Sequence, residues 1–231
     1  MTVQTLGTTL TERLEASQVY QAFIESQFFR DLEMGAVAKE QVGVFLGQWW
    51  HPLHYFPTFL ARCVSVLPDI ASKSAVTRIL NQETGNGRVQ RAHEVIYGDS
   101  MESAGFDRSQ VTGSAPFPET AELVAGYERA SAERCSALGF VYATEVTDLL
   151  MVSSIGTAVN RTTQAEENRW VAIHVAQEPD HVAEASSTML EGFTPEEEDE
   201  IVRAADEMWA LWTRFFQRLS AETGIGQPAS A

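Results

Sequence analysis

The sequence has little cysteine and no long apolar run. Its 231 residues include only two cysteines, Cys63 and Cys135, which cannot make a disulfide framework and which we expect to be small buried residues. No segment approaches the roughly 20 uninterrupted apolar residues of a membrane helix. The N-terminus has no basic stretch followed by an apolar one, so we predict no secretory signal. These absences predict a cytoplasmic protein that makes no use of a membrane.

Basic residues are also scarce. Lys and Arg number 16 against 32 Asp and Glu, which gives a formal net charge of -16. Nucleic acids and anionic membranes are bound through basic surfaces, so we exclude both as partners. A solvated acidic surface that keeps the protein soluble is the ordinary explanation of this charge. The charge also suits a cationic or zwitterionic substrate.

Strand-like alternation of apolar and polar residues is absent, whereas helical patterns separated by short breakers run along the whole chain. We predict helices at 9–33, 36–66, 70–82, 119–137, 139–159, 164–190 and 195–222, and a further helical stretch up to about residue 97. Glycines and prolines predict a loop over 98–118, and Pro52 and Pro57 predict kinks in the second helix. The predicted fold is all-α: one domain over residues 1–231, a bundle of about seven helices.

The last predicted helix has a clear start. Thr194 is a natural N-cap, Pro195 occupies the first helical position and Glu197 completes a capping box. The residues after the helix, 224–231, read as a disordered tail.

Histidine is rare, with five in the chain, and two of them share a helix face. His174, Glu178 and His181 are spaced i, i+4 and i+7, which puts them on one narrow face of a helix. Two imidazoles with a carboxylate between them form a typical set of metal ligands. The alternative is a polar stripe on an exposed helix. Apolar neighbours such as Trp170 and Ile173 indicate that part of this face is buried, where such groups need partners or a metal.

Two acids occur in an almost uncharged stretch, GFVYATEVTDLLMVSSIG. Glu145 and Asp148 are costly there unless they are paired or bound to a metal. A structural ion pair with an arginine is the alternative. Helical bundles that bind two irons supply inward-facing carboxylates and histidines from several helices, which makes Glu145 the better ligand and Asp148 a residue behind the ligands.

Glu83 and His93 lie ten residues apart. In an unbroken helix they would be about 15 Å apart along the axis and about 80° apart in direction, so they could not share a site. Gly85 and Gly87 supply a break between them, because glycine adopts dihedral angles that a helix forbids. We predict that this segment is mobile and becomes ordered when metal binds.

The six residues, in chain order, resemble the haem-oxygenase-like di-iron oxidases and oxygenases. Members show a Glu, then a His within about ten residues, then a Glu, then His-x3-Asp/Glu-x2-His. ETGNGRVQRAH resembles the family's glycine-interrupted helix, and the resemblance covers residues from about 10 to 222. It implies a seven-helix TenA- or PqqC-like bundle with metal ligands Glu83, His93, Glu145, His174, Glu178 and His181.

The resemblance also implies a cofactor and an activity. Two Fe²⁺ ions would be bound, with O2 as co-substrate. Glu145 would lie between the irons and take part in catalysis, Glu83, His93 and His181 would complete one iron, and the other ligands the second. Glu178 stands where an aspartate is more usual, which keeps the charge but lengthens the side chain.

The second helix, FLGQWWHPLHYFPTFLARC, lines the substrate cavity in the resembled family. Its aromatic residues also fit an ordinary core. His51 and His54 are the residues here that we predict to touch substrate and to assist catalysis. Amine N-oxygenating relatives carry an iron-binding carboxylate on this helix, and residues 49–61 contain none. We therefore expect oxidative C–C or C–N cleavage of a small amino-acid or fatty-acid-like substrate, with N-oxygenation as the alternative.

Three basic residues, Arg62, Arg88 and Arg161, could hold a substrate carboxylate. Two further alternatives remain. The chain could be a metal-free thiaminase-like enzyme that uses Cys135 and a glutamate, which leaves three histidines at ligand spacing unexplained. It could also be an iron-binding protein without catalysis. A homodimer is a possible assembly, but the sequence does not determine the oligomeric state.

Overall fold

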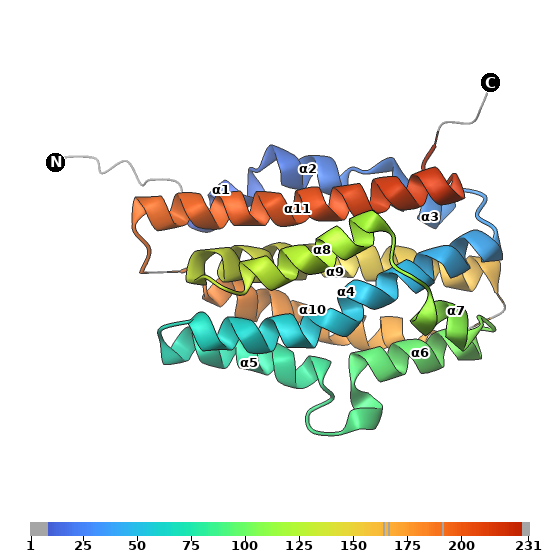
Figure 1. The fold of residues 1–231 in the computed structure, drawn as a ribbon, viewed down its shortest axis with the longest axis horizontal. Helices are drawn as coiled ribbons and strands as arrows, with labels where there is room; N and C mark the ends of the chain where they lie inside the picture. The colour runs from blue at the N-terminus through green and yellow to red at the C-terminus, as the bar shows by residue number, and fades with distance from the viewer. Residues whose placement is uncertain (1–8, 164, 166, 191, 228–231) are drawn as a thin grey trace.

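The computed structural model describes residues 9–163, 165, 167–190 and 192–227. Within these ranges the chain is all-helical, with no strand (Figure 1). The helices are α1 (Leu10–Glu15), α2 (Gln18–Ile24), α3 (Gln27–Met34), α4 (Lys39–Val66), α5 (Ile70–Glu83), the 3₁₀ turn η1 (Val89–Arg91), α6 (His93–Ser103), α7 (Arg108–Gly113), α8 (Pro118–Ala130), α9 (Arg134–Thr162), α10 (Arg169–Ser187) and α11 (Pro195–Thr223). Seven of them have eleven or more residues, which confirms the predicted all-α bundle.

Helix α9 forms the centre of the bundle. Buried side chains occur on every side of it, because it packs against α11, α10, α3 and α4. At Gly139 the helix comes so close to α11 that a Cβ would lie 2.6 Å from the Ile201 carbonyl oxygen. By length and composition α9 could span a membrane, yet 72% of its most apolar window is buried inside the protein. It is the core helix of the bundle.

The N-terminal region differs from the single helix predicted over 9–33. Three short helices stand there, because two serines start new ones. The Ser17 hydroxyl accepts hydrogen bonds from the backbone N–H groups of Val19 and Tyr20, and the Ser26 hydroxyl accepts one from Phe28. Serine competes well for backbone N–H groups at helix starts, so an N-cap overrides the continuous apolar pattern.

The middle of the chain also holds more helix than predicted. The loop expected over 98–118 contains the end of α6 and the whole of α7. The break expected at residue 138 lies earlier, between α8 and α9, and Gly139 is inside α9. A glycine there allows close packing against α11 and does not end the helix. Pro52 and Pro57 both lie inside α4, which is helical from end to end.

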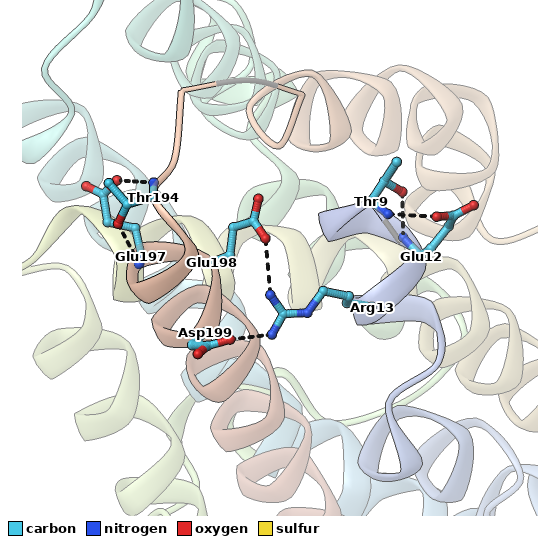
Figure 2. Close-up of polar contacts among 7 residues, drawn as sticks. All are labelled: Thr9, Glu12, Arg13, Thr194, Glu197, Glu198 and Asp199. Carbon is cyan, nitrogen blue, oxygen red and sulfur yellow. Dashed lines mark hydrogen bonds and ion pairs between the residues drawn. The ribbon is translucent and has the colours of Figure 1, made fainter. Parts of the chain in front are cut away.

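The predicted start of α11 is confirmed. The Thr194 hydroxyl accepts from the Glu197 backbone N–H, and the Glu197 carboxylate accepts from the Thr194 N–H at 2.9 Å. Figure 2 shows this capping box on the left. The helix ends at Gly224, which adopts a left-handed conformation. Contrary to the prediction of disorder from residue 224, Ile225 is buried, while residues 228–231 lie outside the described part of the chain.

A second capping box, between Thr9 and Glu12, starts α1 (Figure 2). The next residue, Arg13, donates to Glu198 at 3.1 Å and to Asp199 at 2.5 Å, near the start of α11. Each cap contributes about 1 kcal/mol and each exposed ion pair less than that. These contacts fix the first helix of the chain against the last one.

Candidate metal centre

Helix α10 presents its predicted face to the interior. His174, Glu178 and His181 are between 2% and 4% exposed. The alternative of an exposed polar stripe is therefore wrong for these three residues. Side chains at this spacing lie on one side of a helix, so burial of α10 against α9 and α5 brings them inside together.

Helix α9 supplies the facing carboxylate. Glu145 lies in the middle of the helix, 2% exposed, with its Oε2 atom 3.3 Å from Nδ1 of His181. Asp148 follows one turn later and has its Oδ2 atom 4.0 Å from Nε2 of His174. The predicted alternative for these acids was a pair with an arginine. Their only ion-pair neighbours among the described residues are histidines.

A glycine turn brings the remaining two residues together. Glu83 is the last residue of α5 and His93 is the first of α6, and both are buried. Between them Gly85, Asn86 and Gly87 all have positive φ angles, of 76°, 52° and 76°. The chain therefore reverses, and the Glu83 Oε1 atom lies 2.9 Å from the His93 Nδ1 atom. This confirms the predicted break; the turn protrudes at the lower edge of the bundle in Figure 1.

All six predicted residues meet in one buried cluster, which divides into two groups. The Glu83 group consists of Glu83, His93 and His174, and the Glu145 group of Glu145, Glu178 and His181; within each, one potential ligand atom per residue lies within 4.8 Å of the others. The resemblance implied a different division, with His181 beside Glu83 and His93. In the structure His174 takes that place, and His181 belongs to the Glu145 group. His181 still lies 4.0 Å from Glu83, so the groups are neighbours.

The polar atoms of this cluster lack hydrogen-bond partners. Among the described residues, eleven buried side-chain nitrogen and oxygen atoms have none, and five of them belong to His93, Glu145, Glu178 and His181. Buried polar groups are almost always hydrogen-bonded, since an orphan costs about 1–3 kcal/mol. Such a concentration of unpartnered buried atoms is typical of a cation-binding site, and these donors fit non-haem iron.

Two histidines are held so that one ring nitrogen stays free. In His174, Nδ1 donates to the Trp170 carbonyl oxygen at 2.8 Å, which leaves the lone pair on Nε2. In His93, Nε2 donates to the Gln177 side-chain oxygen at 3.0 Å, which leaves Nδ1 facing Glu83. Once Nδ1 of His93 has lost its proton, this atom and Oε1 of Glu83, 2.9 Å apart, match neighbouring ligands of one ion, which are about 3 Å apart for bonds of about 2.1 Å. Such hydrogen bonds orient metal-binding imidazoles.

The pKa values of the buried acids and histidines also show that these groups are crowded together. Burial raises the pKa of Glu178 to about 12, and the charge of Asp148 adds to the rise. Burial also works against ionised Glu83, but His93 outweighs it and lowers the pKa of Glu83 to about 2. Burial lowers the pKa of His174 to about 4, with a further contribution from His93. The acids thus repel one another where no cation lies between them, and His174 is neutral, as a metal ligand must be.

A cavity with about 30 Å³ of free space, enough for one or two waters, adjoins the cluster. Aromatic and apolar side chains form one wall and the acids and histidines the other. It is lined by Trp49, Pro52, Leu53, Phe56, Glu83, Tyr127, Thr144, Glu145, Asp148, His174, His181 and Trp212. The α4 residues confirm that this helix borders the site. Tyr127, Thr144 and Trp212 were not predicted, because their sequence context is that of ordinary core residues.

The two other histidines lie elsewhere. His51 is hydrogen-bonded to the Ser114 carbonyl oxygen at 2.9 Å, and His54 pairs with Glu94 at 2.7 Å and has a side chain that is 62% exposed. Neither lines the cavity, because they occupy the faces of α4 that point toward α7 and α6. The predicted contact of His51 and His54 with substrate therefore has no support from the geometry.

No arginine lines the cavity either. Arg62 binds Ser131 and Glu128 at the surface, and Arg161 donates to backbone carbonyls at the end of α3. The third basic residue considered, Arg88, lies exposed on the glycine turn. A substrate carboxylate would have to be held by other groups.

The fold is that of the haem-oxygenase-like proteins. A CADD-like protein of unknown function from Nostoc punctiforme superposes with a TM-score of 0.76 at 16% identity, over 93% of this chain and 96% of that one. A domain of unknown function with a heme oxygenase-like fold from Shewanella denitrificans gives 0.75 at 20% identity, over 96% and 95%. A TenA homologue from Pseudomonas syringae gives 0.70 at 14%, over 92% and 91%. These identities establish the fold alone.

The sequence itself establishes the family. Residues 44–213 match a family described as iron-containing redox enzymes, and the chain belongs to that family. The matched segment contains all six residues of the cluster. No curated protein matches the sequence.

Proposed function

We propose that this protein is a di-iron enzyme that uses O2 to oxidise a small organic substrate. The observation that carries the proposal is the buried cluster itself. Four helices bring three histidines and three carboxylates into two adjacent groups whose polar atoms have few other partners. Membership of an iron-containing redox family supports iron as the metal.

In this proposal the Glu83 group holds one iron and the Glu145 group holds the other. Three carboxylates offset much of the charge of two ferrous ions, which makes burial of the pair affordable in a low-dielectric interior. When bound, the iron pair supplies the electrons and the Lewis acidity that O2 reduction requires. Trp170 and Gln177 orient the imidazoles through their hydrogen bonds.

The cavity wall suggests the kind of substrate. Trp49, Phe56 and Trp212 offer flat apolar surfaces, and the free space is small. The side chains of this wall would have to move apart to admit a compact or slender substrate, and around it they would exclude water from the reacting atoms. Because no Lys or Arg lines the cavity, an amino-acid or fatty-acid carboxylate would be bound by the metal pair. We propose oxidative C–C or C–N cleavage of such a substrate.

Both alternative reactions have less support. The part of α4 that lines the cavity carries no acid, as expected for a protein that does not N-oxygenate amines. Cys135 lies in the first turn of α9, about 15 Å along the helix from Glu145, and burial raises the pKa of its thiol. A thiol of this kind is a poor nucleophile.

The proposal is tested with iron-loaded protein and a panel of amino acids and fatty acids. We expect two irons per chain and O2 consumption that depends on both iron and substrate. Trp49→Ala opens the cavity without touching the cluster, so it should change the preferred substrate length while leaving two irons bound. Iron binding without substrate-dependent O2 uptake across the panel would indicate a storage role, and activity in the presence of a chelator would indicate a metal-free enzyme.

A further inference from the structure

We propose that Asp148 is a fourth carboxylate ligand of the metal centre, bound to the same iron as the Glu83 group. This inference rests on the proposed di-iron function and adds a residue to it. Three observations carry it: the contacts of Asp148, the absence of a balancing charge, and the unequal composition of the two ligand groups.

The contacts place Asp148 at the cluster. It is three residues after Glu145 on α9, so both side chains leave the helix on nearly the same side. Its Oδ2 atom lies 4.0 Å from the Nε2 atom of His174. That distance is below the roughly 4.2 Å that separates two ligands on opposite sides of one ion with bonds of about 2.1 Å. Asp148 also lines the cavity beside Glu83 and His174.

The atoms that face each other at this contact are both electron donors. His174 uses its Nδ1 hydrogen to bind the Trp170 carbonyl oxygen, so Nε2 presents a lone pair to the carboxylate. Among the described residues, no Lys or Arg lies within ion-pair distance of Asp148, whose side chain is 18% exposed and whose other close polar neighbour is the carboxyl group of Glu178. A carboxylate and a neutral imidazole with facing lone pairs are stabilised by a cation between them.

The composition of the groups supplies the third argument. The Glu145 group has two carboxylates and one histidine, whereas the Glu83 group has one carboxylate and two histidines. The three carboxylates of the two groups leave one net positive charge on a pair of ferrous ions, which is costly in a buried site. A fourth carboxylate, Asp148, on the group that has fewer acids would balance that charge.

The test is the iron content of reconstituted variants. Wild-type protein should hold two irons, and both Asp148→Asn and Asp148→Ala should hold about one. Combining Asp148→Asn with His93→Ala should cause no further loss, because both changes act on the same ion. Combining it with His181→Ala should remove nearly all iron. Asp180→Asn, which makes the same charge change on the exposed side of α10, is the matched control and should retain two.

Thermal melting gives a readout that does not depend on activity. In the metal-free protein, Asp148→Asn removes an unbalanced acid and should raise the melting temperature, by roughly 2–4 °C in a domain of this size. The rise in melting temperature on adding iron should be smaller than in wild type. A variant that only damaged the fold would melt lower in both states.

The outcomes separate this inference from the proposed function. If wild type holds two irons and Asp148→Asn holds two with an unchanged iron-induced shift, Asp148 is not a ligand, while the di-iron proposal stands. Two bound irons together with loss of substrate-dependent O2 uptake would make Asp148 a substrate contact and would also overturn the inference. If the wild-type protein binds no iron pair, the proposed function is wrong, and the inference about Asp148 is wrong with it.

Discussion

The two ligand groups are built in different ways. The Glu145 group comes entirely from the interiors of two long helices, α9 and α10, which pack along each other. The Glu83 group takes two of its three residues from helix ends on either side of a glycine turn. Positions inside packed helices are fixed by many neighbours, whereas a turn is fixed by few. We therefore expect the Glu145 group to be preformed and the Glu83 group to depend on its turn and on bound metal.

The largest effect should come from the preformed group. Glu145→Ala removes a ligand at the centre of the cluster, and we expect substrate-dependent O2 uptake to fall by at least about 100-fold, together with the loss of at least one iron. Iron analysis and an oxygen electrode measure both. Glu145→Gln, which keeps the shape of the side chain and loses its charge, should lose nearly as much O2 uptake and iron. Full activity in either variant would remove Glu145 from the site.

The glycine turn offers a matched pair of variants. A Cβ on Gly85 would lie 2.5 Å from the Ala92 nitrogen and 2.6 Å from the Arg91 carbonyl carbon, whereas a Cβ on Gly87 would meet nothing within 4 Å. Both have φ of 76°, which costs an alanine about 1–2 kcal/mol. Gly87→Ala should show this cost alone, and Gly85→Ala should lose more stability.

Iron content makes this comparison sharper. Gly85→Ala displaces the start of α6, so it should lose the iron of the Glu83 group and keep the other. Hydrogen exchange should show that residues 84–92 are poorly protected without metal and protected with it, which tests the predicted mobility of this segment. Equal protection in both states, or two irons in Gly85→Ala, would mean that the turn is as rigid as the helices.

The pH dependence of stability should differ between metal-free and iron-loaded protein. Burial lowers the pKa of His181, but Glu145 outweighs it and raises the value to about 9. This stabilisation is complete below the unfolded value of about 6.5 and is lost as the pH rises toward 9. Glu178, with its pKa raised to about 12, acts in the same direction, since the unfolded carboxylate ionises above pH 4.5.

We therefore expect the melting temperature of metal-free protein to fall between pH 6.5 and 9. Iron binding needs deprotonated ligands, so the iron-induced rise in melting temperature should grow over the same range. Differential scanning calorimetry at three pH values, with and without iron, measures both trends. A metal-free protein whose stability rose toward pH 9 would contradict the assigned contact between His181 and Glu145.

The smallest effect should come from the exposed histidine of α4. His54→Ala removes a surface pair with Glu94, which contributes less than about 1 kcal/mol. We expect unchanged iron content and O2 uptake within twofold of wild type. His51→Ala, which removes a bond to a backbone carbonyl at α7, should likewise leave activity in place. A strong loss in either variant would restore the role that the sequence suggested for them.

Much of the cluster was predictable from local spacing. The face shared by His174, Glu178 and His181 follows from helix periodicity, and their burial follows from the apolar residues around them. Glu83 and His93 were predictable because glycine at positions 85 and 87 can reverse a chain that a helix would extend. In each case a few neighbouring residues carry the whole signal.

Other features depend on contacts between distant residues. Periodicity places His174 and His181 on one face of α10, but it cannot show that His174 lies nearer to α6 and His181 nearer to Glu145. The faces of α4 are similar in composition, so the sequence could not show that Trp49 and Phe56 point to the cavity while His54 points outward. The short helices of the N-terminal region were missed because the apolar pattern runs on through Ser17 and Ser26.

The sequence by itself determined an all-helical chain with histidines and carboxylates at metal-ligand spacing, because helix periodicity, capping residues and glycine breaks act over a few residues. The family resemblance then implied that six of these residues bind iron. Only the tertiary structure decided which ligands belong together, which side chains border the cavity, and that Asp148 faces His174 without a balancing charge. Those relations arise from helix packing, which brings together residues that are far apart in the chain. No local sequence pattern predicts these contacts.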